Sequence, residues 1–301
     1  MSTATEGHME WEGHTTWYRV VGTLEPGSEL APVVLAHGGP GASHDYIEPI
    51  AELARSGRAC VLYDQVGCGR SQHLRDAPVE FWTVDLFKRE LVELTRTLGI
   101  DGRYHLLGQS WGGMLAMEHA LDHPTGLKSI VVCDSPASMV LWVEEANRLR
   151  EELPPDVQAT LVRHEEAGTT ADPEYEAAVE VFYRRHLCRV EWPDCLERSF
   201  KNIEADPTVY HTMNGPSEFH CIGSLRGWDI TDQLHEIDVP TLLVSGAYDE
   251  ATPLIVRTIH ERIPGSEWVL LDESSHTPHI EEPEAFLAAV EAFLAAVEAA
   301  A

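Results

Sequence analysis

A serine between two glycines is the candidate nucleophile of this chain. The segment Gly108-Gln109-Ser110-Trp111-Gly112 fits the pattern G-x-S-x-G, follows the apolar run YHLLG and precedes the helical stretch WGGMLAMEHAL. In such a strand–turn–helix junction the serine hydroxyl is exposed, and the small flanking residues let strand and helix pass closely. The pattern alone is weak, but in this context it predicts that Ser110 is a nucleophile for acyl transfer.

A serine hydroxyl reacts poorly unless a base accepts its proton. With this motif the partners follow in the order Ser, then Asp or Glu, then His. Asp249 lies in AYDEATP after the run PTLLVSG, and His276 lies in ESSHTPH after EWVLLD. We therefore expect His276 to be the base and Asp249 the acid that orients it. Asp134, at the end of an earlier run, is an alternative acid, whereas His279 is expected to face the following helix.

Acyl transfer also requires donors for the developing oxyanion. The backbone N–H of Trp111, directly after the nucleophile, is expected to be one of them. The second is expected from the loop HGGPG at residues 37–41, which follows the run PVVLA, because this arrangement keeps its other donor there. Gly39 is the preferred glycine and Gly38 the alternative. His37 is expected to have a structural role beside the loop.

Short apolar runs must position these residues, and each is typical of a strand covered on both faces of a parallel sheet. Helical stretches alternate with the runs, which predicts the α/β class: a mostly parallel central sheet with helices on both faces. Because the carboxyl ends of parallel strands share an edge, Ser110, Asp249 and His276 are expected to meet. An antiparallel pair is expected at one edge, within Met9–Val21. The predicted strands are Pro32–His37, Ala59–Asp64, Tyr104–Gly108, Ser129–Asp134, Pro240–Gly246 and Glu267–Asp272, and the predicted helices are Val79–Leu98, Trp111–Asp122 and Pro253–Arg262.

The alternation of strands and helices stops between about Ser135 and Gln233. This segment is rich in Glu, Arg and Ala and shows no convincing strand. We predict that residues 135–233 form a helical cap on a core made of residues 1–134 and 234–301. A cap over a sheet edge is a usual place for a substrate pocket. Helical spacing within it predicts helices near Val140–Leu153, Pro155–Ala167 and Glu174–Leu187.

The composition narrows the classes of function. The chain carries 21 basic and 50 acidic residues, a net charge of −29, which repels nucleic acid and anionic membranes. No apolar run reaches the length of a membrane span, and the start of the sequence lacks a signal-peptide pattern. Six scattered cysteines favour free thiols and a cytoplasmic location. Neither a CxxC pair nor HExxH occurs, so no metal or other cofactor is expected.

Several longer segments make the chain resemble a known family. They are HGGPGASHDY (37–46), YDQVGCGRS (63–71), GQSWGGMLAMEHA (108–120), MNGPSEF (213–219), WDITDQL (228–234), SGAYDEATP (245–253) and SSHTPHIEEP (274–283). Together they resemble the proline iminopeptidase family of serine aminopeptidases and related amino-acid amidases. HGGPG followed by DQ-x-G-x-GRS is much more specific than the serine motif alone.

The resemblance implies an α/β-hydrolase core with a helical cap. It implies removal of an N-terminal residue, proline or another small apolar residue, from short peptides or amino-acid amides. It carries the catalytic triad onto Ser110, Asp249 and His276, and carboxylates that bind the α-ammonium group onto Glu218 and Glu250. An exopeptidase must pair a desolvated cation with fixed negative charge, and such charge-assisted hydrogen bonds are short and strong.

Two positions depart from the family pattern and leave the substrate open. Many proline-specific members have GGSWGS around the nucleophile, whereas this chain has Gln109 and Gly113 in place of glycine and serine. An amidase or a broader aminopeptidase fits equally well. An esterase or another small-molecule serine hydrolase is the alternative, but it has no need of Glu218 and Glu250. A non-catalytic binding protein would not require an intact triad.

Overall fold

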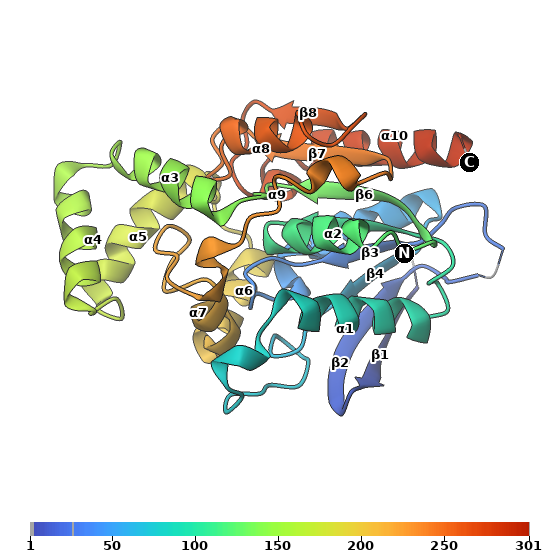
Figure 1. Cartoon of the computed structure of the whole chain (residues 1–301), viewed down its shortest axis with the longest axis horizontal. Helices are drawn as coiled ribbons and strands as arrows, with labels where there is room; N and C mark the ends of the chain where they lie inside the picture. The colour runs from blue at the N-terminus through green and yellow to red at the C-terminus, as the bar shows by residue number, and fades with distance from the viewer. Residues whose placement is uncertain (1–2, 26, 301) are drawn as a thin grey trace.

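The computed structural model describes residues 3–25 and 27–300. Its centre is an eight-stranded sheet with the order β1-β2-β4-β3-β5-β6-β7-β8 (Figure 1). β1 and β2 form an antiparallel pair at one edge, and the strands from β3 to β8 are parallel to one another. The strands are β1 (Ala4–Trp11), β2 (His14–Val21), β3 (Val33–Ala36), β4 (Cys60–Tyr63), β5 (Tyr104–Gln109), β6 (Leu127–Cys133), β7 (Thr241–Gly246) and β8 (Glu267–Leu271).

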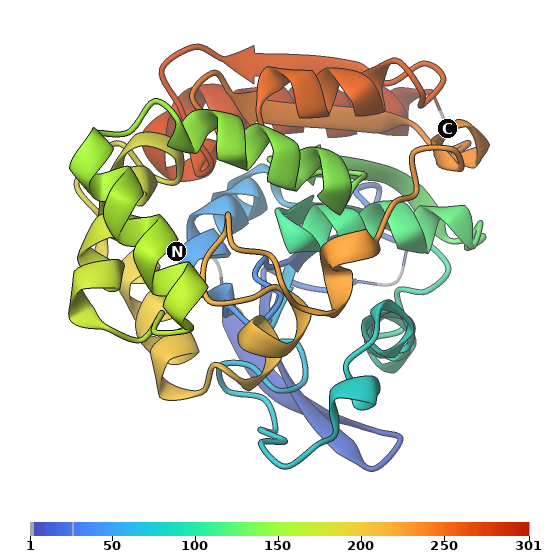
Figure 2. The ribbon, with the colours of Figure 1, turned by 60° about the vertical axis from the view of Figure 1, so that its left-hand side comes forward.

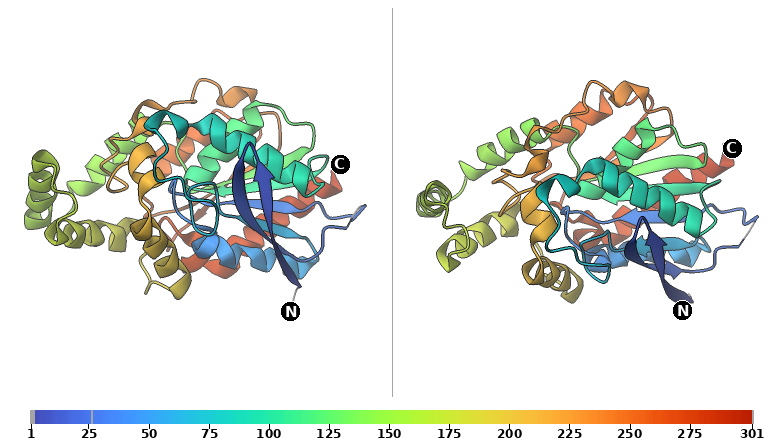
Figure 3. Two further views of the ribbon diagram at one scale, coloured as in Figure 1. Left: turned by 90° about the horizontal axis from the view of Figure 1, so that it is seen from below. Right: turned by 60° about the horizontal axis from the view of Figure 1, so that its bottom comes forward.

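Helices cover both faces of the sheet (Figure 3). Successive side chains of a strand point to opposite faces, so Val34 and Leu106 pack toward α1, α2 and α8, whereas Val33 and Leu107 pack toward η1 and α10. Both faces of the inner strands are therefore apolar, which explains their continuous hydrophobic runs. The helices outside residues 135–233 are η1 (His44–Ser56), η2 (Val79–Phe81), α1 (Val84–Thr97), α2 (Trp111–Leu121), η4 (Leu234–Glu236), α8 (Pro253–His260), α9 (Pro278–Glu281) and α10 (Pro283–Ala299).

Between β6 and β7 the chain leaves the sheet and forms a group of helices at one end of the molecule (Figures 1 and 2). Local signals define their starts: Ser138 caps the first, its hydroxyl accepting the Leu141 N–H at 3.3 Å, and Asp172 caps the third through the Glu174 N–H at 2.9 Å. The segment contains α3 (Met139–Arg150), α4 (Pro155–Ala167), α5 (Pro173–His186), α6 (Asp194–Ala205), α7 (Thr208–Met213) and η3 (Ser224–Gly227).

The predicted fold class is confirmed, because a mostly parallel sheet lies between two helical layers. The N-terminal antiparallel pair is confirmed as well. The sequence analysis missed η1, a 3-10 helix that contains Pro49, and it missed α6 and α7. None of the helices in residues 3–25 and 27–300 combines the length and apolarity needed to cross a membrane.

Candidate active site

Ser110 occupies the sharp turn between β5 and α2. Its φ of 55° is in the left-handed region, which non-glycine residues rarely adopt. The Ser110 N–H donates to the Cys133 carbonyl at 2.8 Å and so ties the turn to β6. Gly112 permits the close approach of α2 to β3, because a Cβ there would lie 2.1 Å from the Ala36 carbonyl oxygen. A strained backbone held by its neighbours is a feature of functional sites.

His276 and Asp249 form a buried pair at the same sheet edge. Nδ1 of His276 lies 2.7 Å from Oδ1 of Asp249, which also accepts the Ala251 N–H at 2.8 Å. Burial lowers the pKa of His276, but the Asp249 carboxylate and, more weakly, Glu218 outweigh it and raise this pKa above its ordinary value. The structure therefore brings together the acid and base expected from the sequence.

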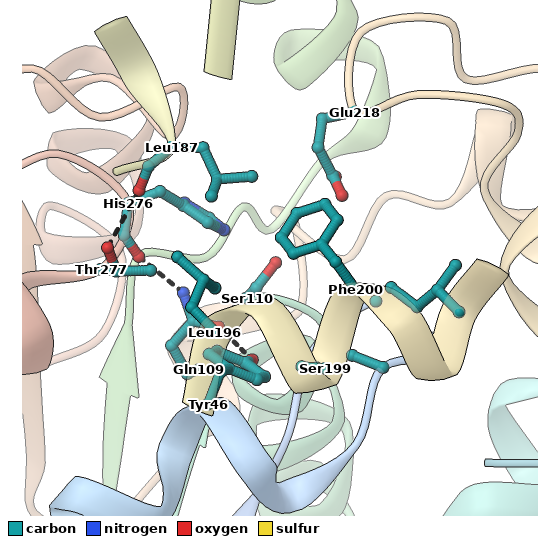
Figure 4. Close-up of a pocket in the computed structure, with 13 residues that line it drawn as sticks. Tyr46, Gln109, Ser110, Leu187, Leu196, Ser199, Phe200, Glu218, His276 and Thr277 are labelled. Atoms are coloured by element: carbon teal, nitrogen blue, oxygen red, sulfur yellow. Dashed lines mark hydrogen bonds between the residues drawn. The ribbon is translucent and has the colours of Figure 1, made fainter. Parts of the chain in front are cut away.

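Ser110 and His276 line one pocket of about 400 Å³ together with Gly39 and Glu218. In Figure 4 the Ser110 hydroxyl, the His276 ring and the Glu218 carboxylate point into the same space. Helices of the 135–233 segment supply apolar walls to the pocket, including Leu196 and Phe200 of α6 as well as Leu187 and Ile203. The serine and histidine are thus placed where a substrate carbonyl can reach both.

A chain of hydrogen bonds joins the glycine loop to the histidine loop. The Gly38 N–H donates to the Tyr46 hydroxyl at 2.7 Å, and this hydroxyl donates to the Gln109 side-chain oxygen. The Gln109 amide in turn donates to the His276 carbonyl at 2.8 Å (Figure 4). Because the Gly38 N–H is already engaged, Gly39 is the better placed of the two candidate oxyanion donors.

Glu218 projects into the pocket from the loop after α7. Oε1 accepts a hydrogen bond from the Tyr210 hydroxyl at 2.6 Å, and the Glu218 N–H donates to the Tyr183 hydroxyl at 3.3 Å. Burial raises the pKa of Glu218, and the Tyr210 hydrogen bond and the nearby His276 lower it less. The carboxylate therefore lacks a full counter-charge where it faces the pocket.

Glu250 is more isolated than Glu218. Its side chain is fully buried, and neither carboxylate oxygen has a hydrogen-bond partner among the described residues. Oε1 lies 3.8 Å from Nε2 of His276. Burial, then the charges of Glu218 and Asp249, raise the pKa of Glu250 well above its ordinary value. Glu250 is not among the residues that line the pocket, so it contributes from beside His276.

Similar sequences show the protein family to which this chain belongs. Residues 31–283 match the family described as the alpha/beta hydrolase fold. The proline iminopeptidase of Lactobacillus acidophilus is 39% identical over 94% of this chain and 95% of its own length. The chain belongs to the proline iminopeptidase family. It is therefore a serine hydrolase, as the sequence predicted.

Two solved structures resemble the fold in detail. The crystal structure of VinJ shares 48% identity with a TM-score of 0.95, covering 97% of this chain and 99% of VinJ. The proline iminopeptidase of Mycobacterium smegmatis shares 45% identity with a TM-score of 0.91, covering 98% of this chain and 99% of that structure. The resemblance thus extends over the whole sheet and over the helices inserted between β6 and β7.

The two departures from the family pattern have a visible structural role. A Cβ at Gly113 would lie 2.0 Å from the Ser135 hydroxyl oxygen, so Ser135 fills the space of a larger residue there. This hydroxyl donates to the Ser110 carbonyl at 2.8 Å. Gln109 lines the pocket and links Tyr46 to the His276 loop. Gly113 therefore makes room for Ser135, and Ser135 and Gln109 brace the turn at Ser110, a role that no local sequence signal indicated.

The 135–233 segment also anchors the two loops that carry Asp249 and His276, a contact that sequence reasoning missed. The carbonyl of His186, the last residue of α5, accepts the N–H groups of Glu250 at 3.3 Å and His276 at 3.2 Å. Nδ1 of His186 lies 2.9 Å from the Tyr248 carbonyl oxygen. The helical segment therefore helps to set the positions of the loops after β7 and β8.

Two other buried histidines, His37 and His279, have contacts apart from the Asp249–His276 pair. Gln65 donates its N–H to Nε2 of His37 at 3.0 Å, and Nδ1 of His37 lies 3.0 Å from the Gly38 carbonyl oxygen. His279 has Nε2 2.9 Å from the Tyr46 carbonyl oxygen. Burial lowers the pKa of His279 to about 4 and lowers the pKa of His37. Both ring nitrogens of His37 are engaged, whereas Nδ1 of His279 is buried without a hydrogen-bond partner among the described residues. Neutral, buried rings outside the pocket are typical of structural histidines.

One group of side chains in the described residues could offer three ligand atoms to a metal. It consists of His164, Asp172 and Glu174 on α4, α5 and the turn between them. The Glu174 carboxylate is paired with the Arg163 guanidinium at 2.8 Å, so a cationic side chain already occupies its vicinity. This group is not part of the pocket around Ser110.

Proposed function

We propose that this protein is a serine aminopeptidase that hydrolyses the bond after a free N-terminal residue in short peptides or amino-acid amides. The observation that carries the proposal is the pocket in which a serine, a histidine and a carboxylate without a full counter-charge meet. The names of the relatives, proline iminopeptidases, support proline as the preferred residue. A pocket that contains such a carboxylate suits a positively charged α-ammonium group, because charge-assisted hydrogen bonds are strong.

In this proposal Ser110 attacks the carbonyl carbon of the terminal residue. His276 accepts the hydroxyl proton and later delivers it to the leaving amine, while Asp249 holds the imidazole in its working tautomer. The backbone N–H groups of Gly39 and Trp111 stabilise the oxyanion. Trp111 is the first residue of α2, where an N–H has no acceptor within its own helix.

The substrate amine would bind to Glu218, with Glu250 adding negative charge nearby. Two nearby buried carboxylates repel each other when both are ionised. A cation bound between or beside them reduces this repulsion and favours the ionised forms. The raised pKa values of both groups support this assignment. Binding of the ammonium group is then expected to draw both residues toward the ionised state.

Two pockets share Ser110, Gly39 and Glu218 and could hold the two halves of the substrate. The smaller has apolar walls that include Met114 and Trp142, which suits a compact apolar terminal residue. The other adjoins a larger groove through Phe200 and Ile203. We assign the terminal residue to the smaller pocket and the departing chain to the one that opens into the groove.

We also propose a role for the helical segment in substrate selection and a cytoplasmic location for the protein. Residues 135–233 supply Glu218 and the apolar pocket walls, and this supports their role as a substrate-selecting cap on a core of residues 1–134 and 234–301.

All six cysteines lie in the described residues and are free, which supports a reducing, cytoplasmic compartment.

The test compares free and N-acetylated forms of the same aminoacyl anilides, beginning with proline. Acetylation removes the charge and leaves buried carboxylates without a cation, a loss of about 3–5 kcal/mol. The expected decrease in kcat/KM is therefore about two to four decades. Glu218→Gln should lower kcat/KM for free-amine substrates about 10- to 100-fold, the range for a hydrogen bond to a charged group, and should affect neutral esters less.

The matched control is Glu166→Gln, which makes the same change on the exposed surface of α4. It should leave both substrate classes unchanged. If Glu218→Gln cleaves free aminoacyl anilides as well as the parent does, or if the parent prefers acetylated substrates, the aminopeptidase proposal fails. An esterase on the same Ser110 machinery would then be the better description.

A further inference from the structure

A second buried carboxyl group stands beside the proposed catalytic acid. Asp134 follows β6, the strand next to β7 in the sheet. Its N–H donates to the Val244 carbonyl at 3.0 Å, and the Gly246 N–H donates to its Oδ1 at 3.2 Å. The φ of Asp134 is 52°, an uncommon value for a non-glycine residue. This backbone turn directs the carboxyl group to the end of β7, just before Asp249.

The oxygens of the two aspartates are not equally satisfied. Oδ1 of Asp249 accepts from His276 and Ala251, and Oδ1 of Asp134 accepts from Gly246. Both Oδ2 atoms are buried without a donor among the described residues, and the charge of Asp249 acts on the Asp134 carboxyl group. Carboxylate oxygens are acceptors only, so the two Oδ2 atoms can satisfy each other only when one of them carries a proton.

Two adjacent buried carboxylates cannot both ionise near neutral pH, and one of them keeps a proton. The anion belongs on Asp249, which faces the His276 ring and a backbone donor, whereas Asp134 has a single backbone donor. We propose that Asp134 is a positioning residue: it carries the proton of this pair, donates it to Oδ2 of Asp249, and so fixes the carboxylate that orients His276. The inference rests on the proposed role of Asp249 in the triad.

The surroundings of Asp134 favour its neutral form. Burial, then the charge of Asp249, raise the pKa of Asp134 well above its ordinary value, and Glu281 of α9 acts in the same direction. On the other side of Asp249 lie His276 and the buried Glu250. The Cys133 thiol precedes Asp134, and burial raises its pKa as well. Among these groups only His276 can carry positive charge, and it is bound to Asp249.

The proton on Asp134 affects the pKa of His276, the proposed base. A hydrogen bond from Asp134 withdraws charge from Asp249 and limits how strongly the carboxylate stabilises the imidazolium. The pKa of His276 then stays lower than it would beside an unassisted carboxylate. Because His276 must be neutral to accept the serine proton, Asp134 keeps the enzyme active toward lower pH.

The test compares Asp134→Asn with Asp134→Ala in pH profiles of kcat/KM for a free aminoacyl anilide. The asparagine amide can donate to Asp249 and accept from Gly246, so the profile and kcat should match the parent. Alanine removes the donor. Its kcat should fall about 10- to 100-fold, and its acidic limb should move up by about one pH unit.

Two results would overturn the proposal. If Asp134 is ionised, Asp134→Asn removes a negative charge and moves the acidic limb down by about one unit. If Asp134 is unimportant, Asp134→Ala keeps both kcat and the limb of the parent.

An infrared difference spectrum of the parent minus Asp134→Asn at neutral pH gives a second readout that does not depend on turnover or on the alanine variant. It should contain the carbonyl band of a protonated carboxyl group, and a carboxylate band instead would refute the assignment. Full activity in Ser110→Ala would reject the proposed function while leaving this spectroscopic result standing, so the two failures are distinguishable.

Discussion

The loops after β4 and β7 each bury a carboxylate, but they surround it differently. Asp64, directly after β4, accepts the His44 N–H at 2.7 Å and the Arg70 N–H at 2.8 Å, and it lies 2.9 Å from Nδ1 of His44. Glu250, in the loop after β7, has no donor on either oxygen within residues 3–25 and 27–300. Both side chains are 0% exposed, so burial alone does not distinguish them.

The difference lies in where the missing positive partner can come from. A carboxylate whose hydrogen bonds are all made within the chain, such as Asp64, stabilises the turn that holds it. A carboxylate left without partners costs free energy that the fold must supply. It persists where a substrate can provide the partner, as we propose for Glu218 and Glu250. Predictions that separate stability from turnover test this distinction.

The largest expected effect is at the nucleophile. Ser110→Ala should lower kcat on the order of a millionfold, because without the hydroxyl only binding and oxyanion stabilisation remain. The melting temperature should stay close to that of the parent. Steady-state rates and thermal unfolding check both points, and a folded variant with half the parent activity would refute the role of Ser110.

The second prediction compares the same change, aspartate to asparagine, in the loop after β7 and in the loop after β4. Asp249→Asn should lower kcat by about 10⁴-fold with little change in stability, because the amide cannot hold the working tautomer of His276. Asp64→Asn should instead lower the free energy of unfolding by about 1–3 kcal/mol, since an amide nitrogen replaces an acceptor that faces a backbone or ring N–H. Its kcat, measured on the folded fraction, should stay near the parent value. The opposite pattern would erase the proposed contrast between the loops.

The site was predictable from the sequence as far as topology determines it. Ser110, Asp249 and His276 each follow an apolar run, and the strands of a parallel sheet bring such positions to one edge. The structure places these residues as expected, although their catalytic roles remain for the variants to test. Strand positions were predictable for the same reason, because a strand buried on both faces is continuously apolar.

Contacts between distant segments were not predictable. The bond from Gln109 to the His276 carbonyl joins residues 167 positions apart, and nothing near Gln109 in the sequence indicates it. The isolation of Glu250 likewise depends on the segments packed around it. The helix η1 was missed because Pro49 interrupts its helical pattern, and α6 because its buried residues, Leu196 and Ser199, are few.

The third prediction concerns the chain of hydrogen bonds that joins the glycine loop to the loop carrying His276. Gln109→Leu removes the bonds to Tyr46 and to the His276 carbonyl while keeping the volume similar. One or two lost hydrogen bonds at about 0.5–1.5 kcal/mol each correspond to a decrease in kcat of about 10-fold, with a smaller effect on KM. Tyr46→Phe should act through the same chain of bonds. The double variant should therefore be less impaired than the two single effects combined, and strict additivity would show that the residues act independently.

The last prediction concerns stability alone and lies on the structural side of the comparison, at Glu90 of α1. Its Oε1 accepts from the Thr16 hydroxyl and from the Val66 N–H at 2.8 Å, whereas Oε2 is buried and finds no partner in the described part of the chain. Burial raises the pKa of Glu90 from 4.5 to about 8. The folded protein therefore keeps a proton that the unfolded chain releases above about pH 4.5. Its stabilising effect is complete below pH 4.5 and is lost as the pH rises to about 8.

In the Glu90→Gln variant the side chain at position 90 cannot ionise, so the variant does not lose stability in this way as the pH rises. Near pH 5 its melting temperature should match or fall slightly below that of the parent, because Oε1 is kept as an acceptor. The difference should then shift in favour of the variant up to about pH 8 and level off above it, by at most about 4–5 kcal/mol in the free energy of unfolding. Other buried acids, including Asp134 and Glu250, titrate in both proteins and cancel in the difference. A difference that does not change with pH would mean that Glu90 is ionised in the fold, and its missing partner would then need an explanation like that of Glu250.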